Sequence, residues 1–294
     1  MLHNPSKIKV AIIGSGKIGT DLLVKTIRSK YLECSLFVGR NINSEGIKKA
    51  IDLGVNVSDQ SINALIDNPN EFDIVFDATS AEDHKYHASI LKEMNKFVID
   101  MTPAKIGTMC IPSVNLNEAL SENNVNMVTC GGQASIPIAY AIGKSHSNVD
   151  YIEVISSISS KSAGAATRLN LDEYIETTEL GLKQFSNAKR TKALLNLNPV
   201  EPCIDMQTTI FAKVQNPNIE KLNEELCELI TNITRYVPGY NIIVPPMIEN
   251  EKIVVMVKVK GLGDYLPEYA GNLDIINCAG IAIAEEYAKK IGVT

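Results

Sequence analysis

The stretch that decides the fold of this chain reads Lys9-Val10-Ala11-Ile12-Ile13-Gly14-Ser15-Gly16-Lys17-Ile18-Gly19. It begins with a short apolar run, which is typical of a buried parallel strand. Three glycines follow with the spacing G-x-G-x-x-G, and residues 21–27 then carry apolar side chains at helical spacing. Between a strand and a helix, such glycines permit a tight turn, close approach of a pyrophosphate and close helix–strand packing. The pattern predicts a Rossmann domain, and the alternative is a glycine-rich turn without a ligand. The candidate cofactor-binding residues are Gly14, Ser15, Gly16, Lys17, Ile18 and Gly19.

The next predicted strand, residues 35–38, ends in Gly39-Arg40-Asn41. A dinucleotide fold usually places an acidic residue here, on the ribose hydroxyls. This chain has none, and Arg40 could instead pair with a 2′-phosphate, stack on adenine or face water. We expect NAD as the cofactor and keep NADP open, with Arg40 as a candidate contact.

A third predicted strand, residues 72–77, ends in the small residues Ala78-Thr79-Ser80. Small residues at the carboxyl end of a strand suit a cofactor lying across the sheet edge, and Thr79 joins the candidates. His84 and His87 follow on a predicted helix and could share a face. A metal site needs further ligands, so no metal is expected.

Cys130 is the candidate nucleophile. It lies in Val128-Thr129-Cys130-Gly131-Gly132, where an apolar strand pattern gives way to a helix pattern. The glycines let backbone N–H groups approach a ligand, and the helix start favours a thiolate. Such a thiolate could attack a carbonyl. A buried cysteine packed as a small apolar side chain is equally well supported by this segment alone.

The second half has a different pattern. Strands are predicted over residues 151–159, 192–197, 208–214 and 252–259, helices over 172–185, 219–234 and 270–291, and a small-residue loop over 162–170. We therefore predict an α/β chain with a Rossmann domain (residues 1–130) and an α+β domain (131–269). The final helix (270–294) is expected to return to the Rossmann domain.

Composition excludes several classes of function. The chain has 294 residues, 45% of them hydrophobic, and a net charge of −6 without a basic cluster, so nucleic-acid binding is disfavoured. No apolar run is long enough for a membrane span, and the polar N-terminus does not resemble a secretory signal. The six cysteines are scattered, which suits reduced thiols. We expect a cytoplasmic protein.

Several motifs together resemble one family, the CoA-acylating acetaldehyde dehydrogenases that partner 4-hydroxy-2-oxovalerate aldolases. The resemblance covers nearly the whole chain, and its most specific segment surrounds Cys130. The matching stretches are residues 14–22, 76–81, 126–134, 159–164, 198–202 and 265–275. It implies a glyceraldehyde-phosphate-dehydrogenase-like two-domain plan with a second domain that is catalytic and forms dimers. It also implies conversion of acetaldehyde, NAD and CoA to acetyl-CoA and NADH in aromatic-compound catabolism.

The resemblance also implies residue roles and partners. Cys130 would attack the aldehyde and then carry the acyl group as a thioester, which CoA takes over. Asn170 would orient the substrate oxygen and, with Asn272, contact cofactor or substrate, although either asparagine could equally be a turn or cap residue. Ser162, Ala163 and Gly164 would line the cofactor site. The implied assembly is a homodimer within a larger complex containing the aldolase.

Three departures from the family pattern stand out, apart from Arg40. Thr208 occupies the position of a family aspartate near the cysteine, and threonine cannot serve as a comparable base. Asp205 lies three residues away on a strand and would face the other side. Ala165-Ala166 replaces the usual proline–glycine, and the stretch between residues 240 and 261 is shorter than in relatives.

Three functional hypotheses follow. The first is an active acetaldehyde dehydrogenase with Cys130 as nucleophile, assisted by Asn170 and Thr208. The second is an acyl-CoA reductase of the same chemistry that acts on another acyl group in a biosynthetic pathway. The third is a weakly catalytic cofactor-binding partner of an aldolase. A phosphorylating semialdehyde dehydrogenase is set aside, because His146 is the only histidine after Cys130 and lies within a predicted helix.

Overall fold

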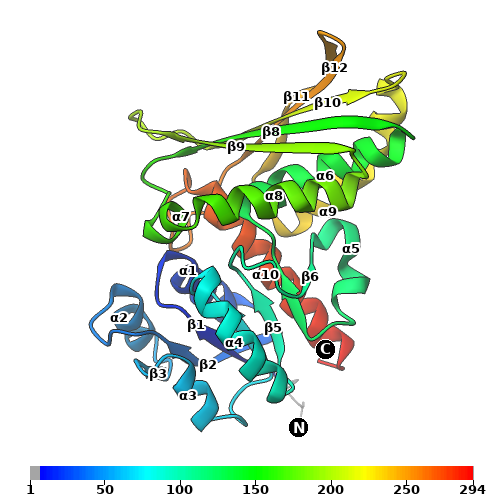
Figure 1. The fold of residues 1–294 in the computed structure, drawn as a ribbon. Helices are drawn as coiled ribbons and strands as arrows, with labels where there is room; N and C mark the ends of the chain where they lie inside the picture. The colour runs from blue at the N-terminus through cyan, green and yellow to red at the C-terminus, as the bar shows by residue number, and fades with distance from the viewer. Residues whose placement is uncertain (1–6, 294) are drawn as a thin grey trace. The chain divides into compact units, whose positions relative to one another are not determined.

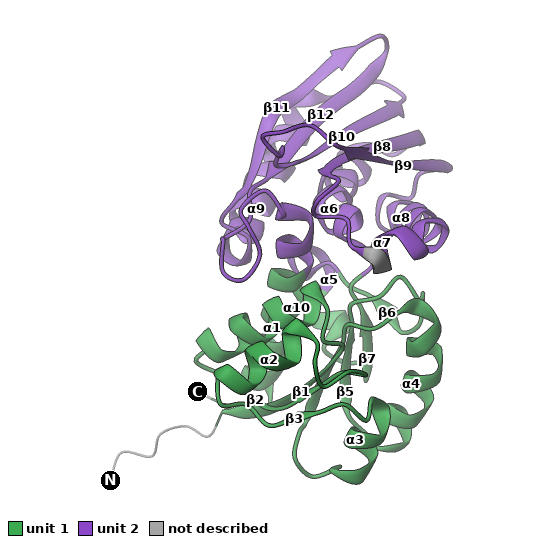
Figure 2. Cartoon of the chain, turned by 90° about the vertical axis from the view of Figure 1, so that its left-hand side faces the viewer, with its two compact units in different colours: residues 1–110, 116–127, 277–294 green, residues 111–115, 128–276 purple. Residues whose placement is uncertain are grey.

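The computed structural model describes residues 7–293, apart from the side chains of residues 165 and 166. It contains two compact units (Figures 1 and 2). Unit 1 comprises Met1–Cys110, Leu116–Met127 and Asn277–Thr294, and unit 2 comprises Ile111–Asn115 and Val128–Ile276. The chain thus changes unit after residues 110, 115, 127 and 276. The sequence predicted boundaries after residues 130 and 269.

Unit 1 is built on a parallel sheet whose described strands follow the order β3-β2-β1-β4-β5-β7-β6. Its central strands are apolar runs buried on both sides, as the sequence predicted. The strands are β1 (Ile8–Ile13), β2 (Leu32–Val38), β3 (Val57–Ser58), β4 (Ile74–Asp77), β5 (Phe97–Asp100), β6 (Thr108–Met109) and β7 (Asn124–Asn126). The helices of unit 1 that follow them are α1 (Lys17–Arg28), α2 (Glu45–Asp52), α3 (Ile62–Asp67) and α4 (Ala81–Glu93). Helix α5 (Pro112–Ala119) begins in unit 2 and ends in unit 1.

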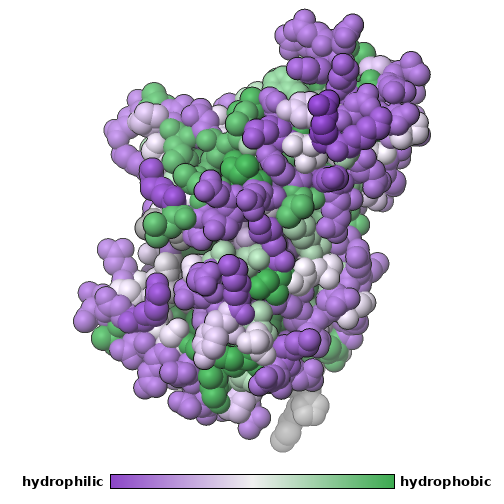
Figure 3. Space-filling view, viewed as in Figure 1, coloured by the Kyte–Doolittle hydropathy of each residue, from purple (hydrophilic) through white to green (hydrophobic). Residues whose placement is uncertain are grey.

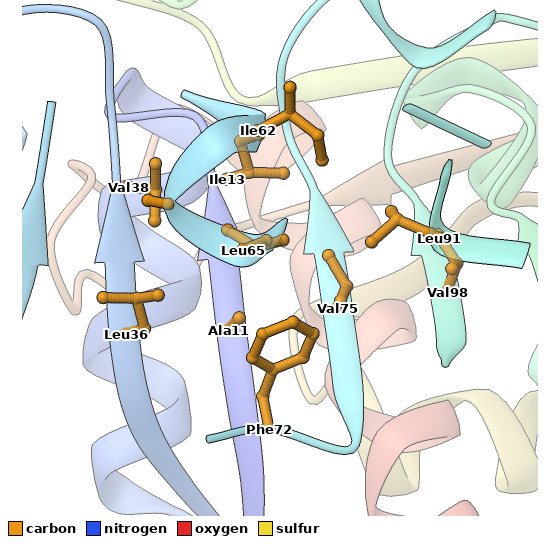
Figure 4. Close-up of a cluster of buried hydrophobic side chains, with 11 residues drawn as sticks. Ala11, Ile13, Leu36, Val38, Ile62, Leu65, Phe72, Val75, Leu91 and Val98 are labelled. Carbon is orange, nitrogen blue, oxygen red and sulfur yellow. The ribbon is translucent and has the colours of Figure 1, made fainter. Parts of the chain in front are cut away.

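One buried cluster holds helices α3 and α4 against this sheet (Figure 4). Ile62 and Leu65 of α3 and Leu91 of α4 face side chains from β1, β2, β4 and β5. Phe72, just before β4, is 1% exposed and fills the space between them. Burying such side chains contributes roughly 1.5–3 kcal/mol each and holds the strand ends, from which the candidate loops leave, in place.

Unit 2 is a five-stranded mixed sheet in the order β11-β12-β10-β8-β9, covered on one face by helices (Figure 1). The strands are β8 (Val149–Ser159), β9 (Arg190–Asn198), β10 (Met206–Val214), β11 (Tyr240–Glu249) and β12 (Lys252–Val259). The helices are α6 (Cys130–Ser145), α7 (Ala165–Leu169), α8 (Leu171–Ser186) and α9 (Ile219–Tyr236). The last helix, α10 (Gly271–Lys290), begins in unit 2 and continues in unit 1.

Two elements of unit 2 differ from the prediction. The loop expected over residues 162–170 contains the short helix α7. Strand β11 was missed, because Pro245 and Pro246 argue against a strand interior. The strand tolerates them because it lies at the sheet edge, with its register shifting between Val244 and Met247. An edge strand does not need every N–H group for the ladder.

The glycine loop after β1 offers a matched pair of substitutions. A Cβ atom on Gly19 would collide with the carbonyl oxygen of Gly14, whereas one on Gly16 would meet nothing within 4 Å. We therefore expect Gly19→Ala to lower the free energy of unfolding by about 2 kcal/mol or more. Gly16→Ala, the control, should change it by less than about 1 kcal/mol. Chemical denaturation measures both values, and equal values would contradict this account of the turn.

Candidate active site

The start of α6 places Cys130. Thr129 is the N-cap residue, and its hydroxyl accepts a hydrogen bond from the N–H of Gly132 at 2.8 Å. Val128 precedes it with φ of 61°, a conformation that β-branched residues rarely adopt. This unusual backbone conformation lies in the short connection between β7, which ends at Asn126, and α6, whose first helical residue is Cys130.

The Cys130 thiol is buried, with 8% of the residue exposed, and its Sγ atom lies 3.8 Å from the hydroxyl of Tyr174 on α8. Burial raises the pKa of the thiol. The Tyr174 hydroxyl and the N–H groups of Gly131 and Cys130 act in the opposite direction but do not outweigh it. The N–H groups at the helix start thus favour the thiolate, but desolvation has the larger effect on the pKa of the thiol.

Gly131 brings three elements together. A Cβ atom at this position would collide with the Tyr174 hydroxyl and lie 3.2 Å from Oγ of Ser156 on β8. Ser156 in turn lies opposite Thr208 of β10, and their hydroxyl oxygens are 3.0 Å apart. Thr208 is completely buried, so the position expected to hold an aspartate carries a hydroxyl that is hydrogen-bonded to a serine. It has no group that could act as a base at neutral pH.

Asn170 lies one helical turn from Tyr174. It is the N-cap residue of α8 and half-buried, and its carbonyl oxygen accepts from the Tyr174 N–H at 2.9 Å. The structure thus joins Asn170, Tyr174 and Cys130 through successive contacts. Tyr174 and Ser156 could not be identified from the sequence, because an aromatic residue on a helix and a serine on a strand are ordinary core positions. Only their proximity to Gly131 marks them.

The other candidate residues of unit 2, which are Ser162, Ala163, Gly164 and Asn272, differ in how far they are buried. Ser162 and Ala163 are buried, and the Ser162 hydroxyl donates to the Ser159 carbonyl at 2.8 Å. Gly164 is half-buried, with open space where a Cβ atom would be. Asn272 is completely buried, and neither its side-chain oxygen nor its nitrogen has a hydrogen-bond partner within the described chain. A buried polar group without a hydrogen-bond partner costs about 1–3 kcal/mol. A ligand that binds to the Asn272 amide would remove this cost, so the unpartnered amide is a candidate ligand contact.

The glycine loop of unit 1 has the geometry of a dinucleotide cradle. Gly14 has φ of 117°, and a Cβ atom there would collide with the Ala78 carbonyl oxygen. Ser15 is half-buried, and its hydroxyl lies 3.0 Å from that of Ser44. Gly16 is the N-cap residue of α1, which Lys17 and Ile18 begin, and the space beside it is open. Backbone N–H groups at such a helix start favour an anionic phosphate.

Arg40 and Thr79 complete the predicted set in unit 1. The Arg40 side chain is 79% exposed, with Nη1 3.8 Å from a carboxylate oxygen of Asp83, so it is free to turn toward a ligand. Thr79 is held through both its N–H group, at 3.1 Å, and its hydroxyl by Oδ1 of Asp77. The orientation of Thr79 therefore depends on the buried carboxylate of Asp77.

Asp77 is the centre of a buried ionisable network that the sequence did not reveal. Its Oδ2 atom is 2.8 Å from Nδ1 of His84 and 2.9 Å from Nδ1 of His87. Nε2 of His84 lies 3.4 Å from Oδ2 of Asp100. The two histidines thus share a carboxylate, and no group of three or more possible metal ligands occurs among the described residues.

The pKa values of this network move in different directions. Burial opposes ionisation of Asp77, but the hydrogen bonds from His84 and His87 hold its pKa well below its usual range. Burial likewise lowers the pKa of His84, but the hydrogen bond to Asp77 and the charge of Asp100 raise it above the usual value. Asp100 is completely buried, and burial raises its pKa to about 7 despite the nearby His84.

His146 has a structural role. Its Nε2 accepts from the N–H of Asn218, the N-cap residue of α9, at 2.9 Å. Its Nδ1 lies 3.0 Å from the Ile142 carbonyl oxygen and 2.9 Å from the Ser145 hydroxyl. Both ring nitrogens are therefore engaged at the end of α6, far along the helix from Cys130.

Comparisons with known proteins now decide the family. A family model described as prokaryotic acetaldehyde dehydrogenase, dimerisation, matches residues 130–267. An acetaldehyde dehydrogenase from Spirochaeta aurantia is 60% identical over 96% of this chain and 95% of its own length. One from Pectobacterium atrosepticum is 58% identical over 97% of each. The chain belongs to the acetaldehyde dehydrogenase family. This confirms the resemblance, while the aldolase partnership stays a prediction.

Solved structures confirm the two-domain fold of this family member. Aspartate semialdehyde dehydrogenase with NADP from Candida albicans superposes with a TM-score of 0.69 at 14% identity, covering 98% of this chain and all of that one. The Vibrio cholerae enzyme complexed with ASA gives 0.65 at 15%, covering 97% and 99%. The acetaldehyde dehydrogenase relatives show an oxidoreductase with aldehyde dehydrogenase function, and the fold is shared with the aspartate semialdehyde dehydrogenases. No helix within residues 7–293 is long and apolar enough to cross a membrane.

The buried network predicts how stability depends on pH. Asp100 and His84 bind a proton more tightly in the folded chain, so their stabilising contributions are complete below about pH 4 and pH 6.5, respectively, and are lost as pH rises through the higher folded values. Asp77 has a lowered pKa, so its contribution is lost only in acid. We expect the free energy of unfolding to fall between about pH 5 and pH 8, by up to about 1.4 kcal/mol per pH unit for each proton released.

Asp100→Asn isolates one part of this dependence. The variant should be less stable at every pH, because its amide would face the amide of Asn126, which now donates to Asp100 at 2.7 Å. Its stability should nevertheless fall less steeply between about pH 5 and pH 7, since the amide cannot ionise. Urea unfolding across this range measures both slopes, and parallel curves would refute the assignment of the raised pKa to Asp100.

Proposed function

We propose that this chain oxidises acetaldehyde with NAD and CoA to acetyl-CoA and NADH, with Cys130 as the nucleophile. The observation that carries the proposal is the position of Cys130, which is buried as the first residue of α6 with two glycines beside it. The names of the relatives support acetaldehyde as the substrate. The role of CoA rests on the resemblance of the Cys130 segment to the acylating family.

Residues on this chain fit a nicotinamide dinucleotide. The open side of Gly16 and the start of α1 would hold the pyrophosphate, with Ser15, Lys17 and Ile18 beside it. Arg40 and Thr79 would line the nucleoside and nicotinamide ends, and the unsatisfied amide of Asn272 would bind a polar group of cofactor or substrate. When bound, the oxidised nicotinamide accepts a hydride. NAD is the proposed form, although Arg40 also suits the 2′-phosphate of NADP.

The chemistry centres on the Cys130 sulfur. The thiol loses its proton to solvent, and the thiolate forms a bond to the aldehyde carbon while the carbonyl electron pair moves to oxygen. N–H groups at the start of α6 and the Asn170 side chain would stabilise that oxygen. Loss of a hydride from the carbon, which the bound nicotinamide would accept, lets the oxygen re-form the carbonyl and leaves an acyl thioester on Cys130. The thiol of CoA then loses its proton to solvent, its sulfur bonds to the acyl carbon, and Cys130 leaves as a thiolate.

A second candidate function keeps this chemistry but changes the substrate. The observation that favours it is the hydrogen bond between Thr208 and Ser156. Thr208 stands where the family pattern has an aspartate, and its partner Ser156 lies beside Gly131. The chain would then act on a different acyl-CoA in a biosynthetic pathway. A panel of aldehydes and acyl-CoA thioesters, assayed in both directions, separates the two, and a clear preference for acetaldehyde rejects the second.

The proposal predicts the behaviour of Cys130→Ala. We expect NADH formation from acetaldehyde, NAD and CoA to fall by about a thousandfold or more, since the covalent path is lost. Cys278→Ala is the matched control, because Cys278 is 6% exposed and similarly buried, and it should keep nearly full activity. NADH absorbance measures turnover. A Cys130→Ala variant with wild-type turnover would overturn the nucleophile, and an inactive wild type rescued by Thr208→Asp would show that the family reaction has been lost here.

We also propose a homodimer formed through unit 2, in a complex with an aldolase. Helices α6, α8 and α9 cover one face of the five-stranded sheet, and hydrophobic side chains reach the surface near its strands (Figures 1 and 3). On the face away from these helices, one row across the strands contains Leu194, Ile155, Thr209 and Met256. Phe211 lies in the next row of the same face. Leu194 is 44% exposed and the others are half-buried. The match to a dimerisation domain supports a second copy as the occupant.

The dimer proposal is tested with Phe211→Asp. A carboxylate in an apolar interface is costly, so we expect the variant to dissociate to monomers in light scattering. Gln207→Glu adds a charge to a polar row of the same strand and should stay dimeric. A monomeric wild type, or a Phe211→Asp variant that remains dimeric, would contradict this face as the contact. Co-purification with an aldolase tests the larger complex.

A further inference from the structure

The Tyr174 hydroxyl is the side-chain group that contacts the sulfur of Cys130 in the described part of unit 2. The two atoms are 3.8 Å apart, within hydrogen-bond range for sulfur, and Tyr174 is 7% exposed. A side chain on Gly131 would occupy the place of this hydroxyl. The glycine after the cysteine therefore makes room for the phenol as well as for a ligand.

A chain of hydroxyl groups fixes Tyr174 against the start of α6. The Thr178 hydroxyl donates to the Tyr174 carbonyl oxygen at 2.7 Å, so the Thr129 hydroxyl, 2.7 Å away, must donate to Thr178. Thr129 Oγ1 also accepts from the Gly132 N–H. The N-cap of α6 and the second turn of α8 are thereby tied together, and the distance between the thiol and the phenol is set by both helices.

We propose that Tyr174 is a catalytic residue that donates its hydroxyl proton in a hydrogen bond to the Cys130 thiolate. This role rests on the proposed function of Cys130. In the family pattern an aspartate could orient the thiol or assist its proton transfer. Here Thr208 takes that position and is hydrogen-bonded to Ser156, and the phenol would supply part of the missing assistance. Unlike an aspartate, it acts as a donor to the charged sulfur and keeps its own proton throughout.

The protonation states favour a donor over a base. Burial, and then the adjacent Cys130, raise the pKa of Tyr174 well above its usual value, so the phenol stays protonated at neutral pH. The groups that act on it besides Cys130 are the Gly131 N–H and the Thr129 hydroxyl. Those that act on the thiol, after burial, are Tyr174 and the N–H groups of Gly131 and Cys130. All of these neighbours are uncharged, so this hydrogen bond is a large part of what offsets desolvation of the thiolate.

The hydrogen bond changes direction during the reaction. In the resting enzyme the Cys130 thiol donates to the phenol oxygen. When the thiol proton leaves to solvent, the Tyr174 hydroxyl turns and donates to the sulfur. A hydrogen bond to a charged acceptor is stronger than one between neutral groups, so the contact favours the thiolate over the thiol. The sulfur then forms its bond to the aldehyde carbon, and the phenol is released unchanged.

The test is the pH dependence of Cys130 alkylation in full-length protein. Iodoacetamide is the probe, and mass spectrometry of the Cys130 peptide follows that thiol alone. We expect Tyr174→Phe to raise the midpoint by about one pH unit and to slow alkylation at neutral pH about tenfold. It should lower kcat for NADH formation by a similar factor while KM for acetaldehyde changes little.

Tyr240→Phe is the matched control. Tyr240 is also fully buried, and its hydroxyl donates to the Ala134 carbonyl oxygen of the same helix at 2.7 Å. Its removal tests the loss of a buried hydroxyl on α6 away from the sulfur, and it should leave the midpoint unchanged. A Tyr174→Phe profile that matches the wild type, or an equal shift in Tyr240→Phe, would overturn the proposal.

A second variant covers the case in which Tyr174→Phe does not fold. Difluorotyrosine at position 174 keeps the shape and the hydroxyl but is a stronger donor, so it should move the alkylation midpoint downward. An unchanged or raised midpoint would refute the role of Tyr174. Failure of the proposed function has a different signature, because Cys130→Ala would then retain turnover whatever the alkylation profiles show.

Discussion

The close contact between Gly131 and Tyr174 is the constraint on which the candidate catalytic centre depends. Helix α6 can begin at Cys130 only because Thr129 satisfies the N–H of Gly132 and because no side chain at position 131 displaces the phenol. The same absence of a side chain lets Ser156 approach from β8. Two helices and two strands are therefore positioned around one thiol by hydroxyl groups and a missing Cβ atom, without a charged side chain.

This arrangement has an energetic consequence. A buried thiol without a charged partner is held neutral, and desolvation is the main reason. Reactivity must then arise from groups that interact more strongly with the thiolate than with the thiol, namely N–H groups and the Tyr174 hydroxyl. A raised thiol pKa lowers the fraction of thiolate, which is the form that is oxidised or alkylated.

In unit 1, by contrast, several ionisable side chains are buried together. Asp77 and Asp100 are both completely buried at the carboxyl ends of adjacent strands. Two imidazoles stabilise the charge of Asp77, whereas burial keeps the pKa of Asp100 high despite His84 and the Thr102 N–H group. Removing one partner from such a network leaves a buried charge uncompensated, which is strongly destabilising. Because Asp77 also holds Thr79, the stability of the network and the geometry of a candidate cofactor contact are linked.

Local patterns were sufficient to predict much of this protein. The apolar run 9–13 and its glycines predicted the Rossmann domain, because strand burial and turn geometry depend on neighbouring residues. The Cys130 segment predicted the nucleophile position and, with the other motifs, the family that the comparisons confirmed. Strand β11 was missed because its prolines are tolerated only at a sheet edge, and an edge is a property of the whole sheet.

The neighbours of each reactive group depended on contacts between distant parts of the chain. Tyr174 lies 44 residues from Cys130, and Thr208 lies 52 residues from Ser156, so no spacing rule connects them. The pairing of His84 and His87 on Asp77 likewise requires the strand and the helix after it to pack together. The fold could be recognised, and Cys130 proposed as the nucleophile, from short-range sequence. The protonation of that thiol is set by burial and by hydrogen bonds that only packing creates.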